Sequence, residues 1–173
     1  MTRLQREVIR RFLALGVRYL LVGGQAMRLM GIDRPTRDLD LWIARDRTNT
    51  EAMTSFLQEF PNRPPLERLQ QPNFKFCVGD PVLPEVDILT SVAGDPEFDD
   101  CLSRSQQATL DGYLLQVVAV SDLLAIKRAS ANAMKQDSEN ATFSLEDRAL
   151  AAGTAAKERR DIALLALLLA AGG

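Results

Sequence analysis

The stretch that decides the fold reads LVGGQAM at residues 21–27 and, after a short loop, RDLDLWI at residues 37–43. The mostly apolar run 17–22 ends in a double glycine, which predicts a buried strand that turns into a short helix. In the second segment apolar and polar residues alternate, which predicts a strand with Asp38 and Asp40 on one face. Two like charges on one face repel each other, and the usual reason to keep them is a hard divalent cation such as Mg²⁺.

Composition limits the classes of protein to consider. The 173 residues are 46% hydrophobic and 25% charged, as is ordinary for a globular protein with a real core. Their number predicts one domain, or one domain with a helical appendage. The net charge of −2 argues against binding nucleic acid over the whole surface, though not against a local basic patch. The chain has no histidine, which excludes a Ser-His-Asp or Cys-His mechanism within it.

The cysteines and the apolar runs predict the compartment. Cys77 and Cys101 form no Cys-x-x-Cys pair, so neither a disulfide framework nor a zinc site is expected, and a reducing compartment fits. The N-terminus lacks the apolar core of a signal peptide, and the run 162–171 is too short to span a bilayer. We therefore expect a cytoplasmic protein with no membrane partner. The sequence does not indicate its oligomeric state.

The distribution of proline predicts how the chain is organised. All eight prolines fall between Pro35 and Pro96, and the later part of the chain is rich in alanine and leucine. Proline breaks helices, whereas alanine and leucine favour them. This pattern predicts an α+β fold, in which a mixed β-sheet flanked by helices (residues 1–120) is followed by a helical C-terminal region (residues 121–173) on or beside it.

Local patterns predict the individual elements. Helices are expected at 3–15, at 25–30, from a capping box at Thr48 and Glu51 to about 60, at 96–107, from a cap at Ser121, and at 155–171. Strands are expected at 17–22, 38–44, 74–78 and 85–89, and on both sides of the turn Asp111-Gly112. Residues 80–84 are expected to form a turn, and the polar, alanine-rich segment 131–156 a mobile loop or a weak helix.

Two motifs have both a functional and a purely structural interpretation. Gly23-Gly24-Gln25 is either a turn whose backbone N–H groups hold phosphates or a tight strand-to-helix turn without a ligand. Asp38 and Asp40 are either metal ligands or a solvated polar face of a strand. The core character of the opposite face of that strand favours metal binding.

A third acid strengthens the metal interpretation. Asp87 lies in the otherwise apolar strand 86–89, where it is either a third ligand or an acid at a strand edge. Three carboxylates would hold two metal ions, one on a triphosphate and one on an attacking hydroxyl, and a carboxylate can also take the proton of that hydroxyl. Glu85 shares the predicted face and is a weaker candidate.

The combined pattern resembles a known family. LVGGQA at 21–26, then RPTRDLDL at 34–41, is similar to the nucleotidyltransferase superfamily that includes DNA polymerase β, and most of all to small bacterial members related to abortive-infection toxins. That family carries a Gly-Gly turn, then Asp-x-Asp, then a third Asp on a later strand. The matching residues here are Asp38, Asp40 and Asp87. The segment VSDLLAIK at 120–127 resembles a later block of the family, and Arg160-Asp161 the block after it.

The resemblance implies an activity and a set of site residues. It implies transfer of a nucleoside monophosphate from an NTP to an acceptor hydroxyl, with two Mg²⁺ ions, or Mn²⁺, on the three aspartates. The implied acceptor is a tRNA, a protein or a small molecule, and the implied setting is a toxin with a cognate antitoxin. The nucleotide-binding residues would be Gly23, Gly24, Gln25, Arg37 and Lys127. From the residues alone, Arg37 either clamps phosphate or neutralises nearby acids.

Two other functions stay open at this point. Gln25 stands where many active members of the family carry Ser or Thr, and the segment 128–160 is long, which motivates a catalytically inactive binding or regulatory module. An arginine-bearing first helix, with Arg3, Arg6 and Arg10, is either a solvated face or the basis of an RNA-binding scaffold, whose affinity would depend strongly on salt.

Overall fold

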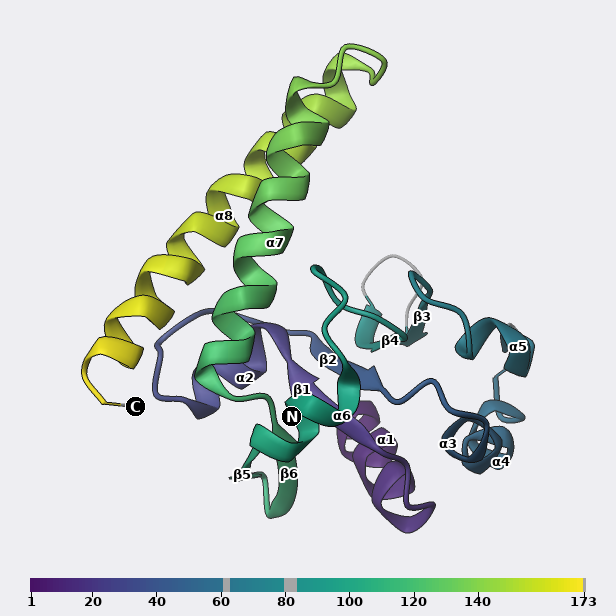
Figure 1. The fold of residues 1–173 in the computed structure, drawn as a ribbon. Coiled ribbons are helices and arrows are strands. Elements are labelled where there is room, and N and C mark those ends of the chain that lie inside the picture. The colour runs from purple at the N-terminus through teal and green to yellow at the C-terminus, as the bar shows by residue number, and fades with distance from the viewer. Residues whose placement is uncertain (61–62, 80–83, 173) are drawn as a thin grey trace. The chain divides into compact units, whose positions relative to one another are not determined.

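The computed structural model describes residues 1–60, 63–79 and 84–172, which form two compact units (Figure 1). The sheet unit comprises residues 1–92 and 97–118, and the helical unit comprises residues 93–96 and 119 onward. The predicted α+β class, with a mixed sheet and a helical C-terminal part, is confirmed.

The sheet unit is built on six strands in the order β3-β4-β2-β1-β6-β5. The strands are β1 (Tyr19–Val22), β2 (Leu39–Ile43), β3 (Lys75–Gly79), β4 (Pro84–Leu89), β5 (Gln106–Leu110) and β6 (Tyr113–Val117). The pairs β2–β4 and β1–β6 are parallel, and the other three pairs are antiparallel. The two central strands therefore connect an antiparallel pair at each edge of the sheet.

One face of this sheet is the core. Leu39 and Leu41 of β2 and Val86 and Ile88 of β4 are fully buried, as alternation along each strand requires. The first helix covers this face, and its Phe12 ring meets the ring of Tyr19 on β1 edge to face, with centroids 5.7 Å apart. The acids of β2 and β4 alternate with these core residues and so project from the opposite face.

The helices of the sheet unit are short apart from the first. They are α1 (Arg3–Ala14), α2 (Gly23–Leu29), α3 (Arg47–Ala52), α4 (Thr54–Leu57), α5 (Leu66–Leu69) and α6 (Phe98–Arg104). Phe98 of α6 packs on Trp42 of β2, with ring centroids 5.1 Å apart. The expected helix at 96–107 is shorter than predicted, because Gln106 and the residues after it pair with β6 as strand β5.

The predicted capping box at Thr48 and Glu51 is wrong. The N-cap of α3 is Asp46, whose side chain accepts a hydrogen bond from the backbone N–H of Asn49 at 2.9 Å. The helical segment is also interrupted at Met53, so that two short helices replace the single one expected. The turn expected at 80–84 lies almost entirely outside the described residues.

The helical unit consists of two long helices, α7 (Val120–Glu139) and α8 (Leu145–Ala170). They run side by side through most of the segment expected to be a loop or a weak helix (Figure 1). Alanine has the highest helix propensity, and Ala131, Ala151 and Ala155 are buried, so small side chains let the two helices approach closely. The cap predicted at Ser121 is wrong, since α7 begins at Val120 after Ala119, without a side-chain cap.

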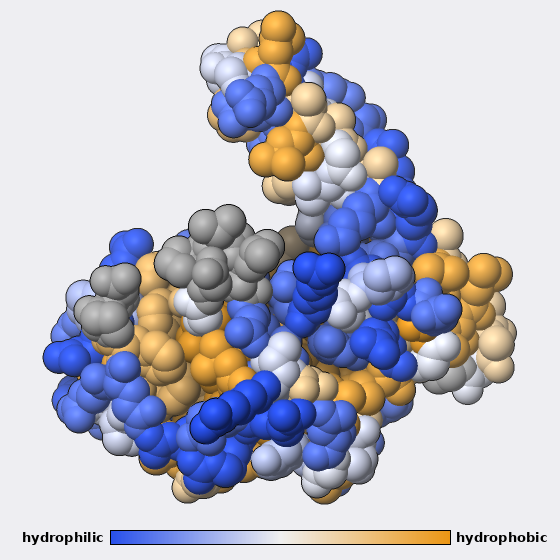
Figure 2. All heavy atoms as spheres, turned by 180° about the vertical axis from the view of Figure 1, so that it is seen from behind, coloured by the Kyte–Doolittle hydropathy of each residue, from blue (hydrophilic) through white to orange (hydrophobic). Residues whose placement is uncertain are grey.

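Several large apolar side chains of α8 and of the turn before it are exposed, among them Phe143, Leu145 and Leu150. Orange, hydrophobic atoms gather at the tip of the helical unit in Figure 2. Among the described residues, no helix combines the length and the apolar character needed to cross a membrane.

Candidate functional site

Two acidic residues lie side by side on neighbouring strands. Strands β2 and β4 run parallel, and Asp40 is the register partner of Asp87. Register partners project from the same face of a sheet, and adjacent strands are about 4.8 Å apart. The structure therefore brings together two of the three predicted carboxylates, which lie far apart in the sequence.

Gly23 makes room for one of these carboxylates. Strand β1 pairs antiparallel with β2, with Val22 opposite Asp40, so the chain turns into α2 directly beside the acid. Gly23 has a φ of 67°, in the left-handed region that favours glycine, and a Cβ atom there would overlap Oδ2 of Asp40. The turn and the carboxylate fit together because residue 23 has no side chain.

Gly24 makes room for the loop that precedes the acids. A Cβ atom on Gly24 would overlap Nη1 of Arg34 and would lie 2.6 Å from Oγ1 of Thr36. The loop between α2 and β2 therefore folds back over the double glycine and brings the Arg34 guanidinium close to it. The number of residues between the glycines and the acids is thus the length of the loop that folds back over Gly24.

Asp87 carries an oxygen atom that lacks a partner. Its side chain is 10% exposed, and among the described residues Oδ1 has no hydrogen-bond partner. A buried carboxylate oxygen without a partner is costly, and a bound cation would offset that cost. This oxygen is therefore a candidate either to bind a cation or to accept a proton from a bound group.

The third predicted acid, Asp38, precedes the strand that carries Asp40. Asp38 lies one residue before β2 and is exposed. Across residues 1–60, 63–79 and 84–172, no three carboxylate, thiol or imidazole groups converge closely enough to hold a metal ion. The site consists of the pair Asp40 and Asp87, with Asp38 two residues before the first of them.

A lysine that the sequence patterns did not single out contacts this pair. Lys75 Nζ donates a hydrogen bond to Oδ2 of Asp87 at 2.6 Å. Burial lowers the pKa of Lys75, but the hydrogen bond to Asp87 and the charges of Asp87 and Asp40 outweigh it, so the pKa lies above its ordinary value. The ammonium is therefore fully charged and lies in the field of both carboxylates.

A glutamine on α1 fixes the strands that carry the acids. The side-chain amide of Gln5 donates hydrogen bonds to the backbone carbonyls of Arg37, at 2.6 Å, and Glu85, at 3.0 Å. Arg37 precedes β2, which holds Asp40, and Glu85 lies in β4, two residues before Asp87. Gln5 is 1% exposed. Its position on the apolar face of α1, between core residues, is the sequence signal that would have revealed it.

The remaining predicted nucleotide-binding residues are placed differently. Gln25 is buried in α2, at 6% exposure, whereas Arg37 is exposed. Lys127 belongs to the helical unit, where its Nζ lies 3.1 Å from Glu158 and 3.0 Å from Asp161. Two carboxylates of α8 thus neutralise this buried ammonium within the helical unit, and a role for Lys127 at a nucleotide stays a prediction.

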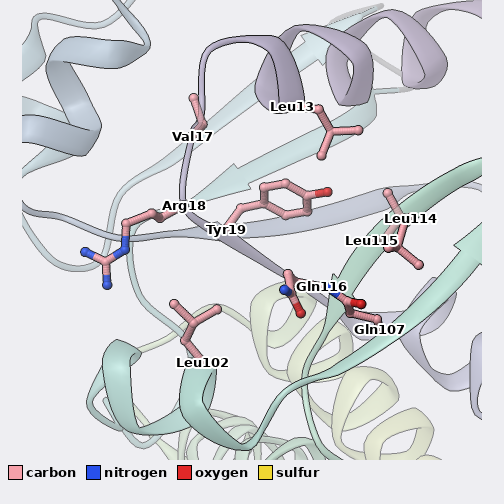
Figure 3. Close-up of a pocket in the computed structure, with 9 residues that line it drawn as sticks. All are labelled: Leu13, Val17, Arg18, Tyr19, Leu102, Gln107, Leu114, Leu115 and Gln116. Carbon is pink, nitrogen blue, oxygen red and sulfur yellow. The ribbon is translucent and has the colours of Figure 1, made fainter.

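A separate cavity of about 460 Å³ opens in the sheet unit between α1, β1, β6 and α6 (Figure 3). Leu13, Leu102, Leu114 and Leu115 supply much of its apolar lining. The hydroxyl of Tyr19, which points between Leu13 and Leu114 in Figure 3, is buried and has no hydrogen-bond partner among the described residues. Burial raises the pKa of Tyr19 to about 12, so the hydroxyl stays neutral at physiological pH.

No protein-family model matches the chain, and no curated protein sequence matches it.

Proposed function

We propose that this chain is a Mg²⁺-dependent nucleotidyltransferase, similar to the superfamily of DNA polymerase β, that transfers a nucleoside monophosphate from an NTP to an acceptor hydroxyl. The observation that carries the proposal is the pair Asp40 and Asp87, in register on parallel strands beside Gly23. Carboxylate oxygens are the ligands that Mg²⁺ prefers, and a turn without side chains lets a triphosphate approach the backbone N–H groups.

Each residue of the site has a role in this proposal. Asp38 and Asp40 would hold the cation, and Asp87 completes the site. When bound, the cation would neutralise charge on the triphosphate and polarise the reacting groups. Because they have no side chains, Gly23 and Gly24 let the carboxylate of Asp40 and the guanidinium of Arg34 lie against the turn, and this guanidinium would add a positive charge where phosphate would lie.

The chemical step follows from this arrangement. The acceptor oxygen attacks the α-phosphorus and forms a new O–P bond. The bond from that phosphorus to the bridging oxygen breaks, and pyrophosphate leaves with the electron pair. The proton of the hydroxyl passes to a carboxylate, for which Oδ1 of Asp87 is the candidate because its hydrogen-bonding capacity is unused.

The acceptor class and the setting come from the family resemblance alone. A tRNA end, a protein hydroxyl and a small molecule are the three acceptor classes, and Gln25, Arg37 and Lys127 are further candidates for contact with the nucleotide. A cytoplasmic toxin held in check by a cognate antitoxin is the setting that we favour.

One observation favours a second candidate function, a nucleotide-binding module without catalysis. Lys75 already neutralises Asp87, and the described residues contain no ready set of three metal ligands. Titration with each NTP, with and without Mg²⁺, separates the candidates from an inert protein. Binding without turnover in the labelling experiment below would favour the module.

The test is transfer of a radioactive label. The protein is incubated with Mg²⁺, total cellular RNA and protein, and each NTP labelled at either the α- or the γ-phosphate. We expect a macromolecule or a small molecule to acquire the α-label but not the γ-label, because pyrophosphate carries the γ-phosphate away. Transfer of the γ-label would mean phosphoryl transfer instead and would refute the proposal.

A further inference from the structure

We propose that Lys75 takes the place of one of the two metal ions, so that the site uses a single divalent cation together with one lysine ammonium. This inference rests on the proposed function. It concerns Asp87, the acid that would otherwise bind the second ion beside the acceptor hydroxyl. The observation behind it is the contact of Lys75 Nζ with Oδ2 of Asp87 at 2.6 Å.

The register of the sheet fixes this lysine on the acidic face. In the antiparallel pair β3–β4, Cys77 is opposite Asp87, and Lys75 lies two residues before Cys77. Residues two apart on a strand share a face, and a diagonal neighbour is within reach of a long side chain. Phe76 and Val78, which alternate with them, are buried on the core face. A slip of one residue would bury Lys75, so its position beside Asp87 is strongly specified.

Charge explains why this lysine excludes a second ion. The ammonium of Lys75 lies 2.6 Å from Oδ2 of Asp87 and neutralises the charge of this carboxylate. A divalent cation bound to Asp87 would lie within a few ångströms of this half-exposed ammonium, and the two like charges would repel each other. The carboxylates left to a divalent cation are then Asp40 and the exposed Asp38.

The same contact leaves Asp87 suited to accept a proton. Its Oδ2 is held by Lys75, whereas Oδ1 has no partner among the described residues. A carboxylate that is anchored through one oxygen and free at the other can take the acceptor proton directly. Lys75 is therefore a positioning residue that acts through Asp87, and it supplies beside this carboxylate the positive charge that a second ion would otherwise supply.

The test counts bound Mn²⁺ by electron paramagnetic resonance of the free ion. The protein is titrated with Mn²⁺ in the presence of each α,β-methylene NTP analogue in turn, so that no reaction occurs. We expect one Mn²⁺ per chain in the wild type and in Lys75→Arg, and two in Lys75→Met. Lys135→Met, which removes an exposed lysine that pairs with Glu139 on α7, is the matched control and should bind one. Fluorescence of Trp42 checks that the sheet unit of each variant is folded.

Every other number of bound Mn²⁺ ions overturns the inference, and each such result has its own meaning. Two ions in the wild type would show that Lys75 replaces none. Equal counts of one in the wild type and Lys75→Met would show that Lys75 is not what excludes the second ion. None in the wild type and one in Lys75→Met would mean that the lysine blocks the site. None in both proteins, with every analogue, would remove the proposed function as well.

Discussion

The buried glutamine of α1 makes the sharpest prediction about what holds the site together. Gln5 donates hydrogen bonds to the carbonyls of Arg37 and Glu85, and so ties the helix to the chain just before each acidic strand segment. The perturbation is Gln5→Met, which keeps the length of the side chain and removes both donors. It also removes the Oε1 atom that accepts from the backbone N–H of Thr2 at 3.0 Å.

The magnitude follows from these three hydrogen bonds. Each of these two partly buried carbonyls costs about 1–1.5 kcal/mol when it loses its donor, at the lower end of the range for an unsatisfied group. Loss of the capping contact adds about 0.5 kcal/mol, since that end of the helix is partly open to solvent. We therefore expect Gln5→Met to lower the free energy of unfolding of the sheet unit by about 3 kcal/mol.

The assay is urea unfolding followed by the fluorescence of Trp42. This residue is the only tryptophan of the chain and lies buried in β2, so it reports on the sheet unit. Gln106→Met, on the exposed edge strand β5, is the matched control and should change the unfolding free energy by less than about 0.5 kcal/mol. A loss below about 1 kcal/mol in Gln5→Met would refute the assigned role, because even one unsatisfied carbonyl should cost that much.

Three further predictions concern other parts of the molecule. Gly23→Ala should destabilise the sheet unit by about 1–3 kcal/mol more than Gly16→Ala in urea unfolding followed by Trp42 fluorescence. Both glycines have a positive φ, but only a Cβ atom at residue 23 would meet Asp40. Tyr19→Phe should match or exceed wild-type stability at neutral pH. Between pH 10 and 12 the wild type should lose more stability than the variant, because the raised pKa of Tyr19 keeps its hydroxyl neutral in the folded state while the unfolded state ionises. Lys127→Met should destabilise the helical unit by about 3–5 kcal/mol by circular dichroism, since it removes the buried ammonium that pairs with Glu158 and Asp161. The exposed substitution Lys157→Met should be nearly neutral.

The strands of the site could be predicted because their signals are local. Alternation in residues 37–43 and the apolar run around Asp87 show which side chains share a face, and this pattern requires no knowledge of the partner strand. The pairing of the strands, in contrast, has no local signal. Asp40 and Asp87 meet because β2 pairs with β4 and not with β3, its successor in sequence, and that choice depends on packing across the whole sheet.

Lys75 and Gln5 escaped prediction for the same reason. The partner of Lys75 is 12 residues away, and the carbonyls that Gln5 contacts are 32 and 80 residues away. The helical spacing from Gln5 to Val8 and Phe12 places Gln5 on the buried face of α1, but no sequence pattern names the partners of either side chain. The helical segment 131–156 was underestimated for another reason: its propensity is high but its apolar stripe is weak, and burial of small alanines between two helices is poorly visible as hydrophobic periodicity.

The central claim is that Asp40 and Asp87 form one catalytic site, and the rate of α-label transfer from NTP tests it most directly. With the acceptor identified by labelling, we compare the wild type with Asp87→Asn and with Asp33→Asn, an exposed aspartate in the loop before the acids. We predict a loss of about a hundredfold or more for Asp87→Asn and a near wild-type rate for Asp33→Asn. Equal rates in the wild type and a folded Asp87→Asn variant would contradict the claim.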